Sequence, residues 1–261
     1  MNWFEKLRQK KAWCPAHAQT LNSGTVPVNA ADTPDTAGGP VERRTRFFTY
    51  MSWAVVAIAF LSAYLALPYL PETIPIHWDA VGNANGFTSG VTGAFMMPCL
   101  MTGFLIILMV IPRFDAMKGT FGLYRDIYAL VIFSIAVFML AIHFFTLLTG
   151  MGYEIPIIVF MPVMMGMLFM VIGSLMPHIG RNTTMGFRLP WTLRDPVVWQ
   201  RTHEYGGKVM VGAGALVVLS SLAGIYAIFL MLAIILVSTG YVTVWSYRFA
   251  KEREKNGVYN L

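Results

Sequence analysis

Five long apolar stretches of this chain contain no Asp, Glu, Lys or Arg, and this feature constrains the fold more than any other. They run over residues 47–70, 92–112, 127–148, 155–176 and 209–247. A helix crosses the hydrocarbon core of a bilayer, about 30 Å thick, with roughly 20 residues at 1.5 Å rise per residue. Four of the stretches fit that length. The sequence therefore predicts an all-α, polytopic membrane protein.

The composition agrees with this prediction. Charged residues make up 12% of the chain and hydrophobic residues 56%, whereas soluble domains average roughly 25% charged residues. A water-soluble domain of this length is excluded, and so is a disordered chain, because apolar residues dominate. The two cysteines, Cys14 and Cys99, lie too far apart in the sequence to suggest a disulfide framework.

The last stretch, 209–247, must fold back on itself. As a single helix it would reach about 58 Å and overshoot any bilayer. A tight turn near Gly224 divides it into two spans, which gives six transmembrane helices in total.

The basic residues predict the orientation of these helices. All 19 Lys and Arg fall within 1–46, 113–125, 181–208 and 248–255, which share one side of the membrane if the six helices alternate in direction. The opposite side carries only Glu72, Asp79 and Glu154 as charged residues. Because basic residues stay on the cytoplasmic side during insertion, both termini are predicted to be cytoplasmic (N-in/C-in).

This topology divides the chain into four parts. Residues 1–46 form a cytoplasmic N-terminal extension, mostly disordered, and 47–112 hold the first two membrane helices with an outer loop. Residues 113–247 hold four further membrane helices with a cytoplasmic loop at 177–208, and 248–261 form a basic cytoplasmic tail.

The outer loop contains Ile-Pro-Ile-His-Trp at 74–78, in which apolar residues alternate with others, followed by turn-forming residues at 82–86. This pattern predicts a short extended flap. His77, Trp78 and Asp79 form either a polar docking or proton-sensitive point on the outer face, or packing within the loop.

The cytoplasmic loop also contains sequence features that a simple connection between two helices does not require. Asp195 followed by Pro196 is typical of a helix start, and Trp199, Thr202 and His203 share one face of that helix by their spacing. Arg188 lies between Gly186 and Pro190, in a constrained turn that fixes its direction. It either recognises an anionic group or is one more positive-inside arginine.

Both loops resemble a known family. The inner segment resembles the signature loop of the SdpI-type immunity proteins of bacteria, through Asn182, Gly186, Arg188, Pro190-Trp191-Thr192-Leu193, Trp199, Thr202-His203 and Gly206-Gly207. The outer segment resembles a membrane domain of unknown function that commonly precedes that loop, through Ile74-Pro75-Ile76-His77-Trp78, Gly82 and Gly86.

The resemblance implies a multi-pass protein of the bacterial cytoplasmic membrane that protects its cell from a secreted peptide toxin. It also implies signalling, by holding a transcriptional repressor at the membrane. We then expect His77, Trp78 and Asp79 to contact the toxin. The expected docking loop for the repressor comprises Asn182, Gly186, Arg188, Pro190, Trp191, Trp199, Thr202 and His203. Partners are the bilayer, a toxin and a repressor, with no direct contact to nucleic acid.

Two other functions stay open. A small-solute or proton-linked transporter would use intramembrane polar groups, of which His143 is the one ionisable side chain well inside a span. An enzyme acting on lipid headgroups would use His178 and His203 as acid and base beside Arg181 and Arg188. No catalytic motif, metal-ligand set or cofactor site is expected, because none of the usual nucleophile, phosphate-binding or zinc patterns occurs.

Overall fold

The computed structural model describes residues 38–114 and 124–256. Most of the predicted N-terminal extension, residues 1–37, lies outside the described residues, so its disorder stays a prediction. The described residues belong to one compact unit of the chain.

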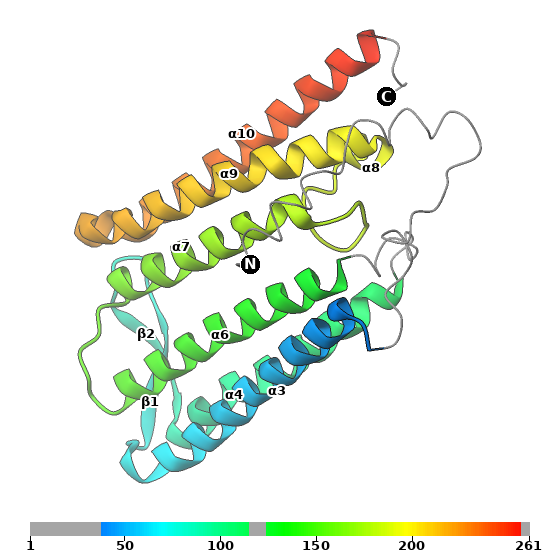
Figure 1. Ribbon diagram of the computed structural model, residues 1–261. Helices are drawn as coiled ribbons and strands as arrows, with labels where there is room; N and C mark the ends of the chain where they lie inside the picture. Colours follow the sequence, from blue (N-terminus) through cyan, green and yellow to red (C-terminus); the bar gives the residue numbers. More distant parts are fainter. Residues whose placement is uncertain (1–37, 115–123, 257–261) are drawn as a thin grey trace, which may run out of the picture. The chain divides into compact units, whose positions relative to one another are not determined.

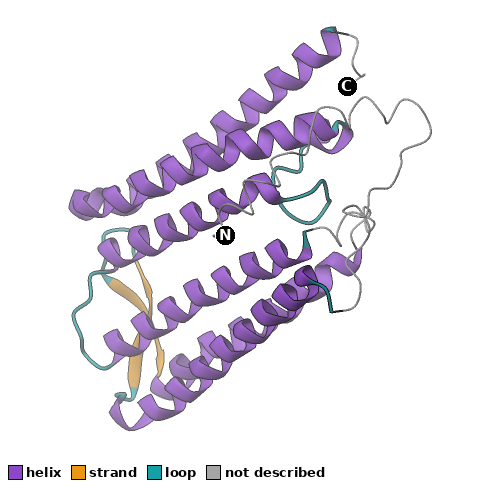
Figure 2. Cartoon of the chain, in the orientation of Figure 1, coloured by secondary structure: helices purple, strands orange, loops and turns teal. Residues whose placement is uncertain are grey.

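Helices dominate the structure, and one β-hairpin lies at the ends of several of them (Figure 1 and Figure 2). The α-helices are α3 (Pro40–Ala66), α4 (Gly90–Val110), α6 (Arg125–Gly150), α7 (Ile157–Leu175), α8 (Pro190–Arg194), α9 (Pro196–Ser220) and α10 (Ala227–Lys255). The strands are β1 (Thr73–Trp78) and β2 (Ala84–Ser89), which pair antiparallel. Short 3-10 turns extend several helices: η2 (Leu67–Tyr69), η3 (Ile111–Phe114), η4 (Met176–His178) and η5 (Ser221–Tyr226).

Among the described residues, five helical segments are long and apolar enough to cross a membrane, and the last of them, Pro196–Lys255, consists of two helices. It turns at Gly224, whose φ of 57° and ψ of −131° are not helical, so that α10 runs back along α9 (Figure 1). Glycine suits this position because it adopts positive φ without steric cost. The six-helix fold with a short extended flap is therefore confirmed, while the orientation of the termini stays a prediction.

Helix α3 begins at Pro40, before the apolar stretch that predicted it. Proline suits a first helical turn because the N–H groups there have no partner within the helix, so none is lost. The negative charge of Glu42 is stabilised by the positive end of the helix dipole. The start of α3 is tied to the start of α6, since the guanidinium of Arg44 lies 2.7 Å from the carboxylate of Asp126.

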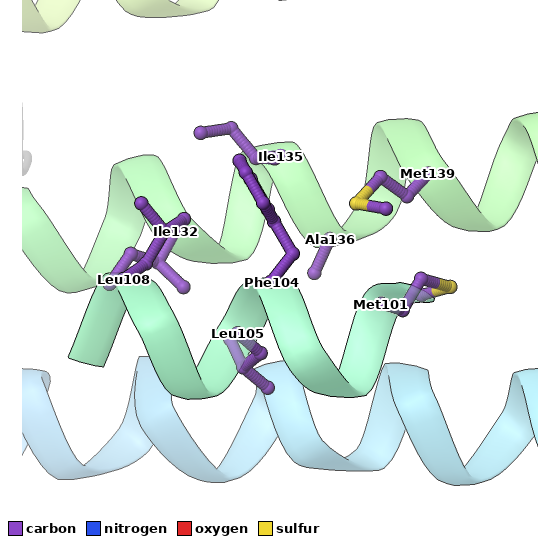
Figure 3. A pocket seen from close by; sticks show the side chains of 8 residues that line it. All are labelled: Met101, Phe104, Leu105, Leu108, Ile132, Ile135, Ala136 and Met139. Carbon is purple, nitrogen blue, oxygen red and sulfur yellow. The ribbon is translucent and has the colours of Figure 1, made fainter. Parts of the chain in front are cut away.

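The helices form two groups that meet between α6 and α7. Helices α3, α4 and α6 share a core of apolar side chains, and α9 packs against both α7 and α10. The first core includes Val55, Val56, Ala59, Met101, Leu105, Tyr128, Ile132 and Ala136. Between α4 and α6 lies a small pocket lined by apolar side chains such as Phe104 and Met139 (Figure 3).

Two pairs of glycines bring the backbones of α7 and α9 into direct contact. A Cβ atom added to Gly207 would lie 2.5 Å from the carbonyl oxygen of Gly173, and one added to Gly166 would lie 2.5 Å from that of Gly214. Both helices repeat glycine at an interval of seven residues (166 to 173 and 207 to 214). Small residues on facing helices allow such an approach, and close packing is a main source of helix association in membranes.

Candidate functional site

The α7–α9 loop, which we define as Met176–Asp195, is built around the side chain of His203. The backbone N–H of Phe187 donates to Nε2 of His203 (3.1 Å), so Nε2 carries no proton. The proton is therefore on Nδ1, which donates to the carbonyl oxygen of Trp199 (2.8 Å). A neutral imidazole in one defined tautomer thus links the loop to α9.

Gly186 allows this link by two properties. Its φ is 99°, a conformation that favours glycine. A Cβ atom at this position would also overlap Nε2 of His203. The requirement for glycine follows from the histidine that it covers.

Trp199 is the largest fully buried side chain, with 1% of its surface exposed. Its Nε1–H donates to the carbonyl oxygen of Ile179 (2.9 Å), and its ring stacks on His203 at 4.0 Å between centroids. The loop and the first turns of α9 therefore share one core.

Asn182 and Thr192 fold the rest of the loop. The Asn182 carboxamide oxygen accepts from the backbone N–H groups of Thr184 and Met185, both at 2.7 Å. The Thr192 hydroxyl donates to the carbonyl oxygen of Phe187 (2.6 Å) and accepts from the N–H of Leu189 (2.9 Å). Both side chains are fully buried, so they serve the loop conformation rather than its surface.

The end of α10 fastens the loop from the other side. The Nε1–H of Trp191 donates to the hydroxyl of Ser246 (2.9 Å). Asp195 caps α9 by accepting from the N–H groups of Val197 (2.7 Å) and Val198 (3.3 Å). Its other carboxylate oxygen accepts from Nε of Arg253 (2.9 Å), and the Asp195 side chain in this ion pair is 6% exposed.

Arg181 and Arg188, two of the three arginines of the loop, have different roles. Arg181 donates to the carbonyl oxygens of Leu193 and Arg194, both at 3.2 Å, and so caps the C-terminal end of α8. Arg188 is exposed and donates to the carbonyl oxygen of Thr183 (2.6 Å). Of the two, Arg188 is thus the arginine presented to solvent by a constrained turn.

The structure divides the expected docking residues by exposure. Asn182, Trp199, Thr202 and His203 are buried and cannot themselves touch a partner, whereas Arg188 and Pro190 are exposed; Gly186 and Trp191 are intermediate. The sequence pattern did not indicate that Arg181 caps α8 or that Ser246 and Arg253 hold the loop. For an enzyme, His203 is poorly placed as an acid or base, because both ring nitrogens are already hydrogen-bonded.

At the opposite ends of the helices, the β-hairpin carries the residues expected on the outer face. Asp79 organises the turn by accepting from the N–H groups of Val81 (3.0 Å) and Asn83 (2.8 Å). The hydrogen bond from the Asn83 backbone holds the pKa of Asp79 below its usual value, so this side chain is ionised at neutral pH.

His77 and Trp78 have different surroundings. His77 is exposed, with Nδ1 lying 2.6 Å from Oδ1 of Asn85 on the facing strand. Trp78 packs edge-on against Phe145 of α6, at 5.0 Å between ring centroids, and Phe145 stacks on Phe160 of α7 at 4.6 Å. His77 is therefore presented to solvent, while Trp78 anchors the hairpin.

Ile74 is the main anchor of the hairpin. It is completely buried and lies against Gly93 of α4 and Gly150 of α6, where an added Cβ would come within 2.5 Å and 2.9 Å of its side chain. The alternation of apolar residues predicted an extended segment here, and the structure has strand β1 at this position. The two glycines that form the socket gave no sequence signal.

We expect Ile74→Ala to destabilise the protein by about 2–4 kcal/mol, because the socket cannot collapse around a missing side chain. Thermal unfolding of the purified protein in detergent micelles measures this change. Val81→Ala is the matched control, since Val81 lies in the same hairpin and is 43% exposed. Equal unfolding temperatures for the two variants would contradict the anchoring role of Ile74.

His143, the ionisable side chain expected well inside a span, makes its contacts within the protein. It is fully buried between α3 and α6, with Nε2 lying 3.0 Å from the hydroxyl of Ser62. That hydroxyl donates to the carbonyl oxygen of Ala59 (3.0 Å), so it accepts from the histidine. Within 38–114 and 124–256, no group of three His, Cys, Asp or Glu side chains is placed to hold a metal ion.

Two family models match this chain, one over the hairpin and the other over most of the α7–α9 loop. The model of the SdpI/YfhL protein family matches residues 178–246, and that of a domain of unknown function, DUF1648, matches residues 54–102. The immunity protein SdpI of Bacillus subtilis (strain 168) is 28% identical over 203 residues, which cover 77% of this chain and 95% of that protein.

A second relative, the uncharacterized membrane protein YbgB of the same organism, is 33% identical over 52 residues, which cover 20% of this chain and 57% of that protein. No solved structure matches the chain significantly. The family resemblance indicated by the two loop motifs is confirmed.

Proposed function

We propose that this immunity-type membrane protein, whose sequence resembles SdpI along most of its length, protects a bacterial cell from a secreted peptide toxin. The observation that carries the proposal is that the segments matched by the two family models contain two connections whose conformations are fixed by buried side chains. One is the hairpin anchored by Ile74, and the other is the α7–α9 loop locked by His203. The proposed role requires no catalysis and no cofactor.

In this proposal the two parts face opposite sides of the cytoplasmic membrane. The hairpin meets the toxin outside through His77, Asp79 and their surroundings. The loop holds a transcriptional repressor inside, through Arg188 and the exposed surface beside it. The buried residues Asn182, Trp199, Thr202 and His203 keep that surface in one shape, so their part in docking is indirect.

Cysteine labelling tests the sidedness. In a variant whose native Cys14 and Cys99 are replaced by serine, Asn83→Cys should react with a membrane-impermeant maleimide added to intact cells. Glu252→Cys should react only after the cells are opened. Both positions are exposed in the structure. The opposite labelling pattern would contradict the predicted orientation.

Substitutions of Arg188 test the docking surface. Arg188→Ala should weaken repressor capture about tenfold while leaving part of the toxin resistance, because a charge-assisted contact is worth about 1.5–3 kcal/mol. Arg188→Lys keeps the positive charge but removes the planar fork of donors, so a site that requires the fork will not tolerate it. A reporter gene controlled by the repressor, with survival measured in the same cells, gives both readouts.

Arg201→Ala is the control for Arg188, since Arg201 is also an exposed arginine near the loop and pairs with Glu204 on its own helix. It should leave repressor capture unchanged at equal membrane expression. Normal signalling in Arg188→Ala and Arg188→Lys together would leave Arg188 as one more positive-inside charge.

A further inference from the structure

The β-hairpin has an open edge on β2. Its sheet consists of two strands, and within the described residues no strand pairs with the outer edge of β2. Four of its six residues are exposed. Proteins usually block such edges with charged residues or proline, but the sequence of β2, Ala-Asn-Gly-Phe-Thr-Ser, contains neither.

The register of the hairpin shows which backbone groups point along this edge. The N–H of Gly90 donates to the carbonyl oxygen of Glu72 (2.8 Å), and Ile74 lies opposite Thr88. Hydrogen-bonded and non-bonded pairs alternate along an antiparallel ladder, so Phe87 directs its N–H and C=O away from β1. Pro75, which has no N–H to donate, lies opposite Phe87 and fits this assignment.

The surroundings of the edge are apolar and acidic. Phe87 on β2 and Val91, two residues beyond its end, are each about 60% exposed. The segments at this end, 67–90, 149–156 and 221–226, contain Glu72, Asp79 and Glu154 but no Lys or Arg. A partner that complements this surface carries positive charge and alternates it with apolar side chains.

We propose that the outer edge of β2 binds an extended cationic peptide as a third strand, with Phe87 supplying backbone hydrogen bonds. Main-chain bonds to a sheet edge give affinity in this mode of recognition, and side chains on alternate positions give specificity. The inference deepens the proposed function, because it names the chemistry of the toxin segment that the hairpin would receive.

A substitution of Phe87 separates the backbone from the side chain. Phe87→Pro removes the outward N–H without removing a bond of the β1–β2 ladder, and Phe87→Ala removes the ring but keeps the N–H. The full chain is placed in nanodiscs of neutral phosphatidylcholine, so that the lipid does not attract the probe. The probe is a fluorescent Lys-Val-Lys-Val-Thr-Lys peptide, and anisotropy reports binding.

We expect the Phe87→Pro variant to bind the probe about tenfold more weakly than the Phe87→Ala variant. The proline removes one main-chain hydrogen bond to the probe, and its ring pushes the probe away from the edge. Equal affinity of these two variants would overturn the proposal. A version of the probe with Glu in place of Lys should not bind. Binding of both probes alike would also overturn it.

A probe with an N-methyl group on every residue, which blocks both edges of the peptide strand, keeps the test valid if Phe87→Pro misfolds. It should not bind the unaltered protein, and binding equal to that of the parent probe would again exclude strand addition. The outcome is distinguishable from that of the proposed function. Survival of cells exposed to toxin, compared with and without the protein, tests immunity as a whole. The probes test only the edge of β2.

Discussion

Gly207→Ala should destabilise the folded protein by about 3 kcal/mol, although it adds only one methyl group. The new Cβ atom would lie 2.5 Å from the carbonyl oxygen of Gly173, which is backbone and cannot rotate away. Helices α7 and α9 would have to separate, and overpacking of this kind typically costs about 1–3 kcal/mol, or more when backbone must move. The unfolding temperature in detergent micelles and the amount of protein in membranes should both fall.

Gly212→Ala provides the control on the same helix. An added Cβ at Gly212 has no atom within 4 Å among the described residues, and alanine favours a helix more than glycine does. This variant should be at least as stable as the original protein. If Gly207→Ala proved as stable as Gly212→Ala, the direct backbone contact between α7 and α9 would be refuted.

The second large effect is expected at Asp195. Asp195→Ala should destabilise the protein by about 3 kcal/mol, because it removes the cap of α9 and leaves the Arg253 guanidinium without its carboxylate. Asp195→Asn keeps a capping oxygen and should recover roughly 1 kcal/mol of this loss. Limited digestion with trypsin provides a local readout, since an opened loop exposes the bonds after Arg181 and Arg188.

Arg253→Ala should resemble Asp195→Asn, because each breaks the ion pair and keeps the cap. Arg248→Ala is the control, as Arg248 lies on α10 and is exposed. Digestion of the Arg253→Ala and Arg248→Ala variants at the same rate would contradict the claim that the Asp195–Arg253 ion pair stabilises the loop.

The number of helices could be predicted from the sequence because the uncharged stretches have the length of a bilayer and the basic residues fall in alternate connections. The position of the turn at Gly224 followed from the excessive length of the last stretch. The hairpin followed from the alternation around Ile74 and Trp78. The turn and the hairpin depend on residues that are close together in the sequence, and the helices depend on local apolar stretches and on the distribution of charge along the chain.

The arrangement of the loop could not be predicted in the same way. The family resemblance led us to expect Trp199 and His203 in the docking loop, yet both are buried. Their burial depends on Ile179 and Phe187, which approach them only after the loop has folded. The links from Trp191 to Ser246 and from Asp195 to Arg253 join residues 55 and 58 positions apart, and nothing in the local pattern indicates such pairs.

The fastening of the loop by α10 has a consequence for synthesis on the ribosome. Ser246 and Arg253, which hold Trp191 and Asp195, belong to the last helix of the chain. The hairpin with its Ile74 socket is complete once α6 has been inserted, but the α7–α9 loop reaches its final form only after α10 follows. A nascent chain that stalls before Ser246 therefore carries a finished hairpin and a loop that still lacks both of these contacts.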